Sequence, residues 1–90
     1  MAEISITVYS KDECCLCDVA KEVIIETLQR MELQHEVPVV TVDITKDKML
    51  HEKYKNDIPV VTINDEFAFR YKVHPITLEK KLVKTMKTPL

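Results

Sequence analysis

The sequence predicts one α/β domain, residues 1–90, in which a four-stranded mixed sheet carries helices on both faces. Three observations support this fold class. Apolar, β-branched segments alternate with segments of helical periodicity, in the order β-α-β-α-β-β-α. The strand–helix–strand pattern of the first half indicates a right-handed parallel unit. A short polar turn in the second half indicates an antiparallel hairpin.

Periodicity predicts the first strand and the first helix. Residues Ile4–Tyr9 alternate in a β-rich composition, which favours a strand. From Cys15 to about Gln34, apolar residues recur every three or four positions and describe one face of a helix. The residues of this face are Ala20, Val23, Ile24, Thr27, Leu28 and Met31. We expect this face to pack against the sheet.

A second strand and a short helix follow. Val37–Ile44 is apolar and β-branched along most of its length, which suits a strand covered on both faces. Pro38 near its start indicates an edge or an entry position. Thr45 is expected to cap a helix from Lys46 to about Lys55. The residues expected to face inward are Leu50 and Tyr54, and those expected to end the helix are Asn56 and Asp57.

A hairpin and a final helix complete the fold. Val60–Ile63 predicts the third strand and Phe67–Val73 the fourth, joined by the tight turn 64–66, Asn-Asp-Glu. Asn and Asp tolerate the left-handed conformation that such a turn requires. Pro75 suits the first turn of the last helix. The buried face of that helix is expected to consist of Leu78, Leu82, Thr85 and Met86.

The composition excludes several classes of function. The chain contains no glycine, whereas about 7% is usual, and P-loops and dinucleotide-binding fingerprints both require it. Every turn is therefore expected to use Asn, Asp, Ser, Thr or Pro. The net charge of −2 argues against binding to nucleic acid. No apolar run approaches the roughly 18 residues of a membrane span, and the start does not resemble a secretory signal, so we expect a cytoplasmic protein.

All three cysteines fall within four residues, directly after the first strand and at the start of the first helix. Cys14 and Cys17 lie on one side of a single helical turn, so their sulfurs can form a disulfide with a small ring. The unpaired N–H groups of a helix N-terminus stabilise a thiolate. Cys14 lies nearest to these groups and is the expected nucleophile. Cys17 is then expected to attack the mixed disulfide and release the product.

Metal binding is the alternative for the same cysteines. Three thiolates and a histidine are suitable ligands for Zn²⁺ or Cu⁺. However, the adjacent Cys14 and Cys15 point in different directions on a helix, and the chain has no second pair of cysteines. The histidines are scattered over positions 35, 51 and 74. We therefore expect no native metal site, and a thiolate metal carrier remains the second candidate function.

The sequence resembles the glutaredoxin family, which has the thioredoxin fold. The segment Tyr9–Cys17 (Y-S-K-x-x-C-x-x-C) is similar to the family's opening motif, and Asp57–Val61 (D-I-P-V-V) is similar to the segment around its cis-proline. The segment Cys14–Asp18 resembles a branch of short glutaredoxin-related proteins with a C-x-L-C-D active site. Together with the order of the elements, the resemblance covers nearly the whole chain.

The resemblance implies a monomeric thiol–disulfide oxidoreductase without a bound cofactor, which cycles Cys14 and Cys17 between dithiol and disulfide in electron transport and redox homeostasis. Its substrates would be protein or glutathione disulfides, with glutathione as co-substrate or a thioredoxin-type reductase as the electron source. Pro59 would be cis and would present the backbone of Ile58 to a substrate strand. Lys11 would stabilise the Cys14 thiolate or meet a carboxylate of glutathione. The simpler interpretations, a strand-entry turn and a solvated lysine, remain open.

The chain also departs from the family's pattern. Cys15 and Leu16 stand between the cysteines, where the family usually carries Pro and an aromatic residue. The family's glutathione site uses a Gly-Gly bend, whereas this chain has Tyr71–Pro75, leaving Thr77 to offer a hydroxyl or N–H at the last helix. The loss of these glycines argues against tight binding of glutathione. An interaction module without oxidoreductase turnover is therefore the third candidate function.

The thiol pKa of reduced Cys14 is expected to lie below the value of about 8.5 of a free cysteine. The helix N-terminus and Lys11 favour the thiolate, whereas the acidic residues at positions 12, 13 and 18 oppose it, so the decrease is smaller than in strongly activated thiols. The rate of alkylation by iodoacetamide as a function of pH measures this pKa. A midpoint at or above the free value would contradict the prediction.

Overall fold

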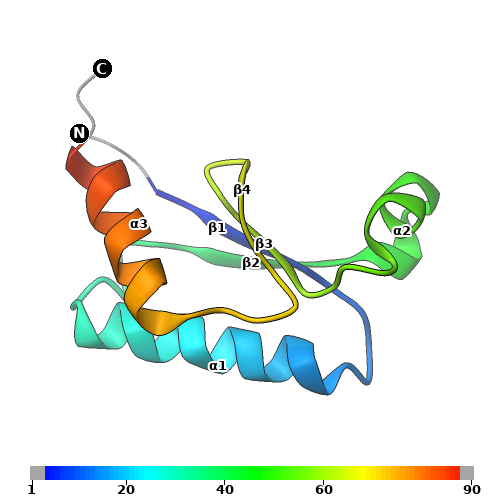
Figure 1. Ribbon diagram of the computed structural model, residues 1–90, viewed down its shortest axis with the longest axis horizontal. Helices are drawn as coiled ribbons and strands as arrows, with labels where there is room; N and C mark the ends of the chain where they lie inside the picture. Colours follow the sequence, from blue (N-terminus) through cyan, green and yellow to red (C-terminus); the bar gives the residue numbers. More distant parts are fainter. Residues whose placement is uncertain (1–3, 88–90) are drawn as a thin grey trace.

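The computed structural model describes residues 4–87, which form a four-stranded mixed sheet with strand order β2-β1-β3-β4 and three α-helices (Figure 1). This confirms the predicted fold class. Among these residues no helix is long and apolar enough to cross a membrane. The elements are β1 Ile6–Ser10, α1 Cys15–Arg30, β2 Val39–Asp43, the 3₁₀ turn η1 Ile44–Lys46, α2 Lys48–Tyr54, β3 Val60–Ile63, β4 Glu66–Arg70 and α3 Pro75–Lys87.

The pairing of the strands brings several loops to one end of the sheet. β1 is parallel to β2 and antiparallel to β3, and β3 is antiparallel to β4. Tyr9 near the end of β1 pairs with Val60 at the start of β3, and Val60 pairs with Arg70 at the end of β4. The loop after β1, the segment before β3 and the bend after β4 therefore lie at the same end.

The main core lies between the sheet and the helices α1 and α3. Ile6 and Val8 of β1 are fully buried against Ile24 of α1, Leu78 and their neighbours. The predicted face of α1 is confirmed in its buried members, which are Ala20, Ile24, Thr27 and Leu28, whereas Val23 and Met31 are half-buried. Tyr9 alternates with Val8 and so points to the opposite face, where its ring lies 4.8 Å from that of Tyr54 in α2. Helices therefore contact both faces, as predicted.

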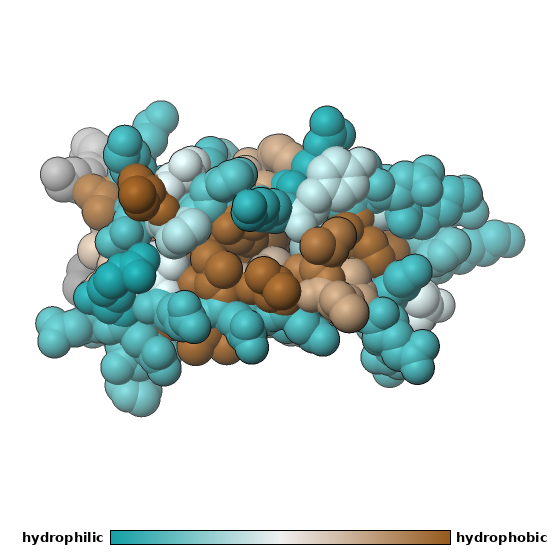
Figure 2. Space-filling view, turned by 60° about the horizontal axis from the view of Figure 1, so that its bottom comes forward, coloured by the Kyte–Doolittle hydropathy of each residue, from teal (hydrophilic) through white to brown (hydrophobic). Residues whose placement is uncertain are grey.

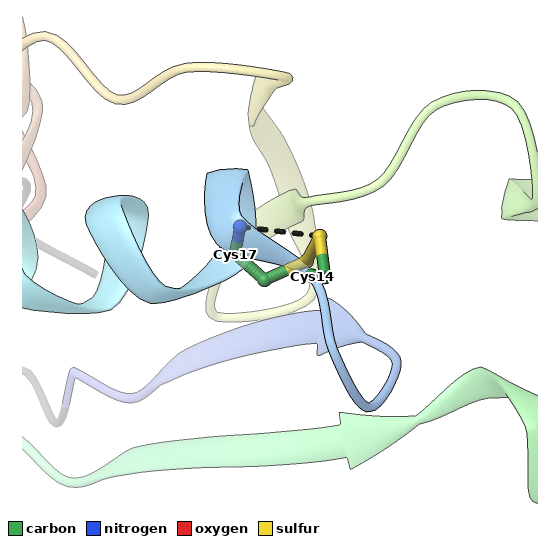
Figure 3. The surroundings of a disulfide bond; sticks show 2 residues. All are labelled: Cys14 and Cys17. Carbon is green, nitrogen blue, oxygen red and sulfur yellow. Dashed lines mark hydrogen bonds between the residues drawn. A yellow bond between two sulfur atoms is a disulfide. The ribbon is translucent and has the colours of Figure 1, made fainter.

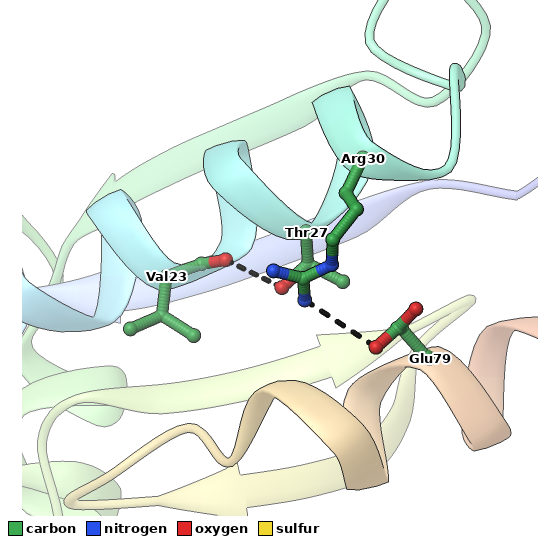
Figure 4. A network of polar contacts seen from close by, with 4 residues as sticks. All are labelled: Val23, Thr27, Arg30 and Glu79. Carbon is green, nitrogen blue, oxygen red and sulfur yellow. Dashed lines mark hydrogen bonds and ion pairs between the residues drawn. The ribbon is translucent and has the colours of Figure 1, made fainter.

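Two polar contacts accompany the packing of α1 (Figure 4). The hydroxyl of the buried Thr27 donates a hydrogen bond of 2.7 Å to the carbonyl of Val23, so its polar atom is satisfied within the helix. Arg30 forms an exposed ion pair of 3.3 Å with Glu79, which joins α1 to α3. Exposed pairs of this kind contribute about 1 kcal/mol or less, so apolar packing holds the two helices together.

α1 ends at Arg30, earlier than the predicted end near Gln34. Glu32 adopts a left-handed conformation with φ 58°, and the Leu33 N–H turns back to donate to the Leu28 carbonyl at 2.8 Å. This arrangement is a Schellman motif, in which glycine usually occupies the left-handed position. Because glutamate stands there instead, the sequence carried no stop signal.

β2 is an edge strand whose residues are all half-buried or exposed, so the prediction of a strand covered on both faces is wrong. It spans Val39–Asp43, and the side chain of Val40 is 49% exposed. Valine and threonine favour strands by their shape, so a β-branched run alone does not distinguish a buried strand from an exposed one. The prediction that Pro38 marks an edge or entry position is confirmed, and its carbonyl accepts a bond of 3.0 Å from the Ile6 N–H.

Asp47, not the predicted Thr45, caps α2. The Asp47 carboxylate accepts hydrogen bonds from the N–H groups of Met49, at 2.9 Å, and Leu50, at 3.2 Å. Thr45 instead lies in η1, where its hydroxyl and N–H donate to Asp43 and lower the pKa of that carboxyl. Both aspartates follow the strong preference of helix N-termini for a short acceptor. The side chains expected to face inward, Leu50 and Tyr54, are only half-buried.

The β3–β4 hairpin is close to the prediction. β3 spans Val60–Ile63 as expected, and Asn64 and Asp65 form the turn with φ values of 51° and 68°. Two consecutive left-handed residues are the signature of a type I′ turn. Glu66 belongs to β4, paired with Ile63, and not to the turn.

Three further residues take left-handed conformations without being glycine. They are Glu13, Glu32 and Tyr71, with φ values of 58°, 58° and 66°. The prediction that turns use only Asn, Asp, Ser, Thr or Pro is therefore wrong. Tyr71 bends the chain directly after Arg70, so β4 ends there and does not continue to Val73 as predicted.

α3 begins at Pro75 as predicted, and its contact with the sheet is shorter than expected. Leu78 and Leu82 are fully buried, whereas Thr85 is half-buried and Met86 is 46% exposed. Each step of four residues turns a helix by about 40° beyond a full circle, so Met86 lies roughly 80° around from Leu78. Because of this rotation, Met86 lies outside the contact between α3 and the sheet.

Replacing Thr62 by valine is expected to stabilise the fold by about 1 kcal/mol. The Thr62 hydroxyl is buried in β3 and has no hydrogen-bond partner within residues 4–87. Valine has nearly the same shape and removes this unpaired polar atom. Urea unfolding measures the change. Thr27→Val is the matched control and is expected to give no gain, because the Thr27 hydroxyl is hydrogen-bonded. A loss of stability in Thr62→Val would contradict the prediction.

Candidate functional site

A disulfide joins Cys14 and Cys17 at the N-terminal end of α1 (Figure 3). Their Cα atoms are 5.2 Å apart, a separation that suits a disulfide. Cys14 has the extended backbone of an N-cap residue, and Cys17 lies in the first turn of the helix. The predicted pairing is therefore present in the structure, and Cys15 is a free, exposed thiol.

The sulfur of Cys14 acts as the helix cap. It accepts a hydrogen bond of 3.2 Å from the Cys17 N–H, which is one of the unpaired groups at the start of α1. Serine, threonine or aspartate oxygens usually fill this role. We expect the same N–H to face a Cys14 thiolate in the reduced protein and to favour its charged form.

The two sulfurs differ in access. Cys17 is 1% exposed and lies in the first turn of α1, whereas Cys14 is half-buried at the end of the loop that follows β1. An external disulfide therefore reaches Cys14 more easily than Cys17. This difference suits an attacking thiol at position 14 and an internal thiol at position 17.

Lys11 lies in the same loop as Cys14, but its side chain forms no ion pair or hydrogen bond with the described residues of the site. It is exposed, as are the neighbouring Asp12 and Glu13, and no ion pair or hydrogen bond of Lys11 occurs among the residues described. Its roles toward the thiolate and toward a ligand carboxylate remain predictions.

The Ile58–Pro59 peptide bond is cis, as the resemblance implied. The pairing of Val60 with Tyr9 brings this segment to the same end of the sheet as the cysteines. Figures 1 and 3 both draw the segment that enters β3 next to the start of α1. Ile58 is half-buried, and in the described part of the chain its N–H and C=O have no hydrogen-bond partner. An extended peptide chain can pair with such groups.

Thr77 makes no hydrogen bond to a cysteine within residues 4–87. It is exposed in the first turn of α3. Glu79, two residues further on, pairs with Arg30 at the opposite end of α1 from Cys14 (Figure 4). The role of Thr77 in ligand binding remains a prediction.

Sequence reasoning missed a polar cluster beside the Ile58–Pro59 segment. The hydroxyl of Tyr71 donates a hydrogen bond of 3.1 Å to Asp57 Oδ1, and Arg70 Nη1 lies 3.9 Å from the same oxygen. The Arg70 guanidinium also lies 5.5 Å from the centre of the Tyr71 ring. The one available signal was a tyrosine at the position of a glycine bend, because a bulky residue needs anchoring to remain in a left-handed conformation.

Several apolar side chains of α1 and α3 are exposed to solvent. Leu16 and Val19 of α1 and Ile76 of α3 are each more than half exposed. Figure 2 shows apolar side chains gathered in the middle of the face that it draws, with hydrophilic ones around them. Among residues 4–87 no three His, Cys, Asp or Glu side chains are grouped to hold a metal ion.

Comparison with known proteins assigns the family. A sequence model of the Glutaredoxin-like domain (DUF836) matches residues 5–84. A curated glutaredoxin-like protein from Dictyostelium discoideum is 29% identical over 72 residues, which cover 78% of this chain and 67% of that protein. Because the family model matches most of the chain, the agreement extends well beyond the cysteine motif.

Solved structures agree in fold. A protein of unknown function from Staphylococcus aureus has a TM-score of 0.73 at 17% identity, covering 97% of this chain and 94% of its own. A thioredoxin variant from Halobacterium salinarum has a TM-score of 0.64 at 13% identity, covering 99% of this chain and 80% of its own. Identities this low show the fold alone. The chain has a thioredoxin-like fold and belongs to the Glutaredoxin-like domain (DUF836) family.

Proposed function

We propose that this protein is a small thiol–disulfide oxidoreductase that transfers electrons by cycling Cys14 and Cys17 between dithiol and disulfide. The observation that carries the proposal is the Cys14–Cys17 disulfide at the N-terminus of α1, where the Cys14 sulfur accepts the Cys17 N–H. Membership of a glutaredoxin-like family and the thioredoxin-like fold support it.

The reaction begins with the reduced protein. The Cys14 thiolate attacks one sulfur of a substrate disulfide, and the other sulfur leaves as a thiolate that takes up a proton from solvent. Cys17 then loses its proton to solvent and attacks the Cys14 sulfur of the mixed disulfide. This step forms the Cys14–Cys17 bond and releases the second substrate thiolate. The second thiolate also takes up a proton from solvent. Counted from the dithiol, whose Cys14 first loses its proton to solvent, the protein loses two electrons and two protons, and the substrate gains the same.

The positions of the two thiols fit this order of steps. Cys14 is half-buried and caps the helix through its sulfur, so it is suited to meet an external disulfide. Cys17 is 1% exposed and is suited to react only with the sulfur already bound on Cys14. An external reductant, either two molecules of glutathione or a thioredoxin-type reductase, then restores the dithiol.

We propose protein disulfides as the main substrates. The unpaired backbone of Ile58 supports pairing with an extended substrate segment, and the exposed Leu16 and Val19 beside the disulfide offer apolar contact. Glutathione is the proposed co-substrate. Its tight binding has less support, because Tyr71 takes the left-handed position where a glycine would leave room.

A redox titration with thiol trapping and mass spectrometry tests the proposed function. We expect Cys14 and Cys17 to become oxidised together, with a two-electron response in which a tenfold change in the redox ratio corresponds to about 30 mV. Cys15→Ser is the matched control and should titrate in the same way. Pairing of other cysteines, or no reversible pairing, would contradict the proposal. Reversible pairing without turnover of any disulfide would instead indicate an interaction module.

A further inference from the structure

One residue, Tyr71, fastens the bend after β4 to the segment that enters β3. Its N–H donates a hydrogen bond of 2.8 Å to the Pro59 carbonyl, and its hydroxyl donates one of 3.1 Å to Asp57 Oδ1. The two bonds bracket Ile58 from either side. The orientation of the Ile58 backbone is therefore tied to the position of the Tyr71 side chain.

The conformation of Tyr71 is one that a bulky residue rarely adopts. Its φ of 66° lies in the left-handed region, which persists in such residues where the surroundings fix it. Arg70 adds to the fixation, because its guanidinium lies over the Tyr71 ring and its Nη1 is 3.9 Å from Asp57 Oδ1. An unfavourable conformation maintained by several contacts points to a functional constraint at this bend.

The bracketed segment lies next to the cysteines. The pairings of Val60 with Tyr9 and with Arg70 place Ile58 at the end of the sheet where the loop to Cys14 begins. The N–H and C=O of Ile58 are unpaired in residues 4–87, so they are available to a strand that approaches the disulfide. A rotation of this backbone would misalign such a strand without moving either sulfur.

We propose that Tyr71 is a positioning residue for disulfide exchange with peptide chains. Through its hydroxyl bond to Asp57 it holds the Ile58 backbone in the orientation in which a substrate strand pairs beside Cys14. This inference rests on the proposed function. It adds that Tyr71 sets the preference for disulfides of extended peptides over disulfides of small molecules. Tyr71 acts through Ile58 and does not react itself.

The test compares two disulfides in single-turnover reactions of the reduced protein. One is a linear peptide pair joined by a disulfide, and the other is hydroxyethyl disulfide, which is too small to pair with Ile58. In Tyr71→Phe the ring and the bend remain and the hydroxyl is lost. We expect the half-saturating concentration of the peptide to rise about threefold to tenfold with an unchanged maximal rate. The rate with hydroxyethyl disulfide should not change.

Three further variants separate positioning from general damage. Asp57→Asn keeps an acceptor oxygen for the Tyr71 hydroxyl and should stay close to the wild type. Asp57→Ala removes that acceptor and should reproduce Tyr71→Phe. Tyr54→Phe removes a hydroxyl from a tyrosine that stacks on Tyr9 and makes no hydrogen bond through its hydroxyl to the residues described, so it should behave as the wild type.

The outcomes are distinct. Equal half-saturation by the peptide in Tyr71→Phe and the wild type would overturn the inference, as would an equal slowing with both disulfides. Formation of the Cys14–Cys17 disulfide in the wild type by hydroxyethyl disulfide upholds the proposed function whatever the variants do. If the wild type reacts with neither disulfide, the proposed function fails and this inference fails with it.

Discussion

Replacing Cys14 by serine is expected to lower the rate of disulfide reduction by about a thousandfold or more, down to the uncatalysed background. A serine hydroxyl does not form the anion that attacks sulfur at neutral pH, whereas we expect the Cys17 N–H, which donates to the Cys14 sulfur, to favour a thiolate there. Turnover of a peptide disulfide measures the loss. Retention of full activity in Cys14→Ser would show that the proposed mechanism is wrong.

Two companion variants sharpen this experiment. Cys17→Ser keeps the attacking thiol but lacks the resolving one, so the mixed disulfide on Cys14 should accumulate and be visible by mass spectrometry. Cys15→Ser is the matched control, because Cys15 is exposed and free. Cys15→Ser should retain nearly full turnover. A loss comparable to that of Cys14→Ser would show that the assignment of Cys14 as the only attacking thiol is wrong.

Replacing Leu82 by alanine is expected to lower the free energy of unfolding by about 2–5 kcal/mol. Leu82 and Leu78 are fully buried, whereas the other described side chains of α3 are half-buried or exposed. A cavity at Leu82 therefore removes a large part of the attachment of α3 to the core. The total stability of a chain of this length is about 5–13 kcal/mol, so the expected loss is a substantial fraction of it.

Urea unfolding followed by circular dichroism measures this change. The matched control is Val83→Ala, on the neighbouring position of the same helix, where the side chain is 37% exposed. We expect the control to lose less than about 1 kcal/mol. Equal losses in the two variants would mean that α3 does not pack through Leu82.

The parts of the fold that were predicted well carry strong local signals. Pro75 marks the start of α3, the cysteine pair marks the start of α1, and two turn-forming residues follow β3. The end of α1 was missed because Glu32 does there what glycine usually does. The exposure of β2 was missed because valine and threonine favour strands by their shape, so a β-branched run does not show that the strand is buried.

The candidate site also contains features that local sequence predicted and features that it did not. Cys14 and Cys17 are neighbours in sequence, so helix geometry predicted their pairing. The contact of Tyr71 with Asp57 joins residues 14 positions apart, and they meet only because the hairpin folds back. No periodicity or spacing reveals a side-chain contact of that kind. The roles of Lys11 and Thr77 stay predictions, since each side chain is exposed and makes no hydrogen bond or ion pair in the described part of the chain.

The five left-handed residues have a consequence for the denatured ensemble. A non-glycine residue in this conformation costs about 1–2 kcal/mol in the folded state, and less for Asn and Asp. A glycine at each position would remove that cost but would add conformational freedom to the unfolded chain, which is worth about 0.4–1 kcal/mol per position. The second effect offsets about half of the first. A chain without glycine is thus stiffer when unfolded, and it has fewer backbone states to search each time it folds.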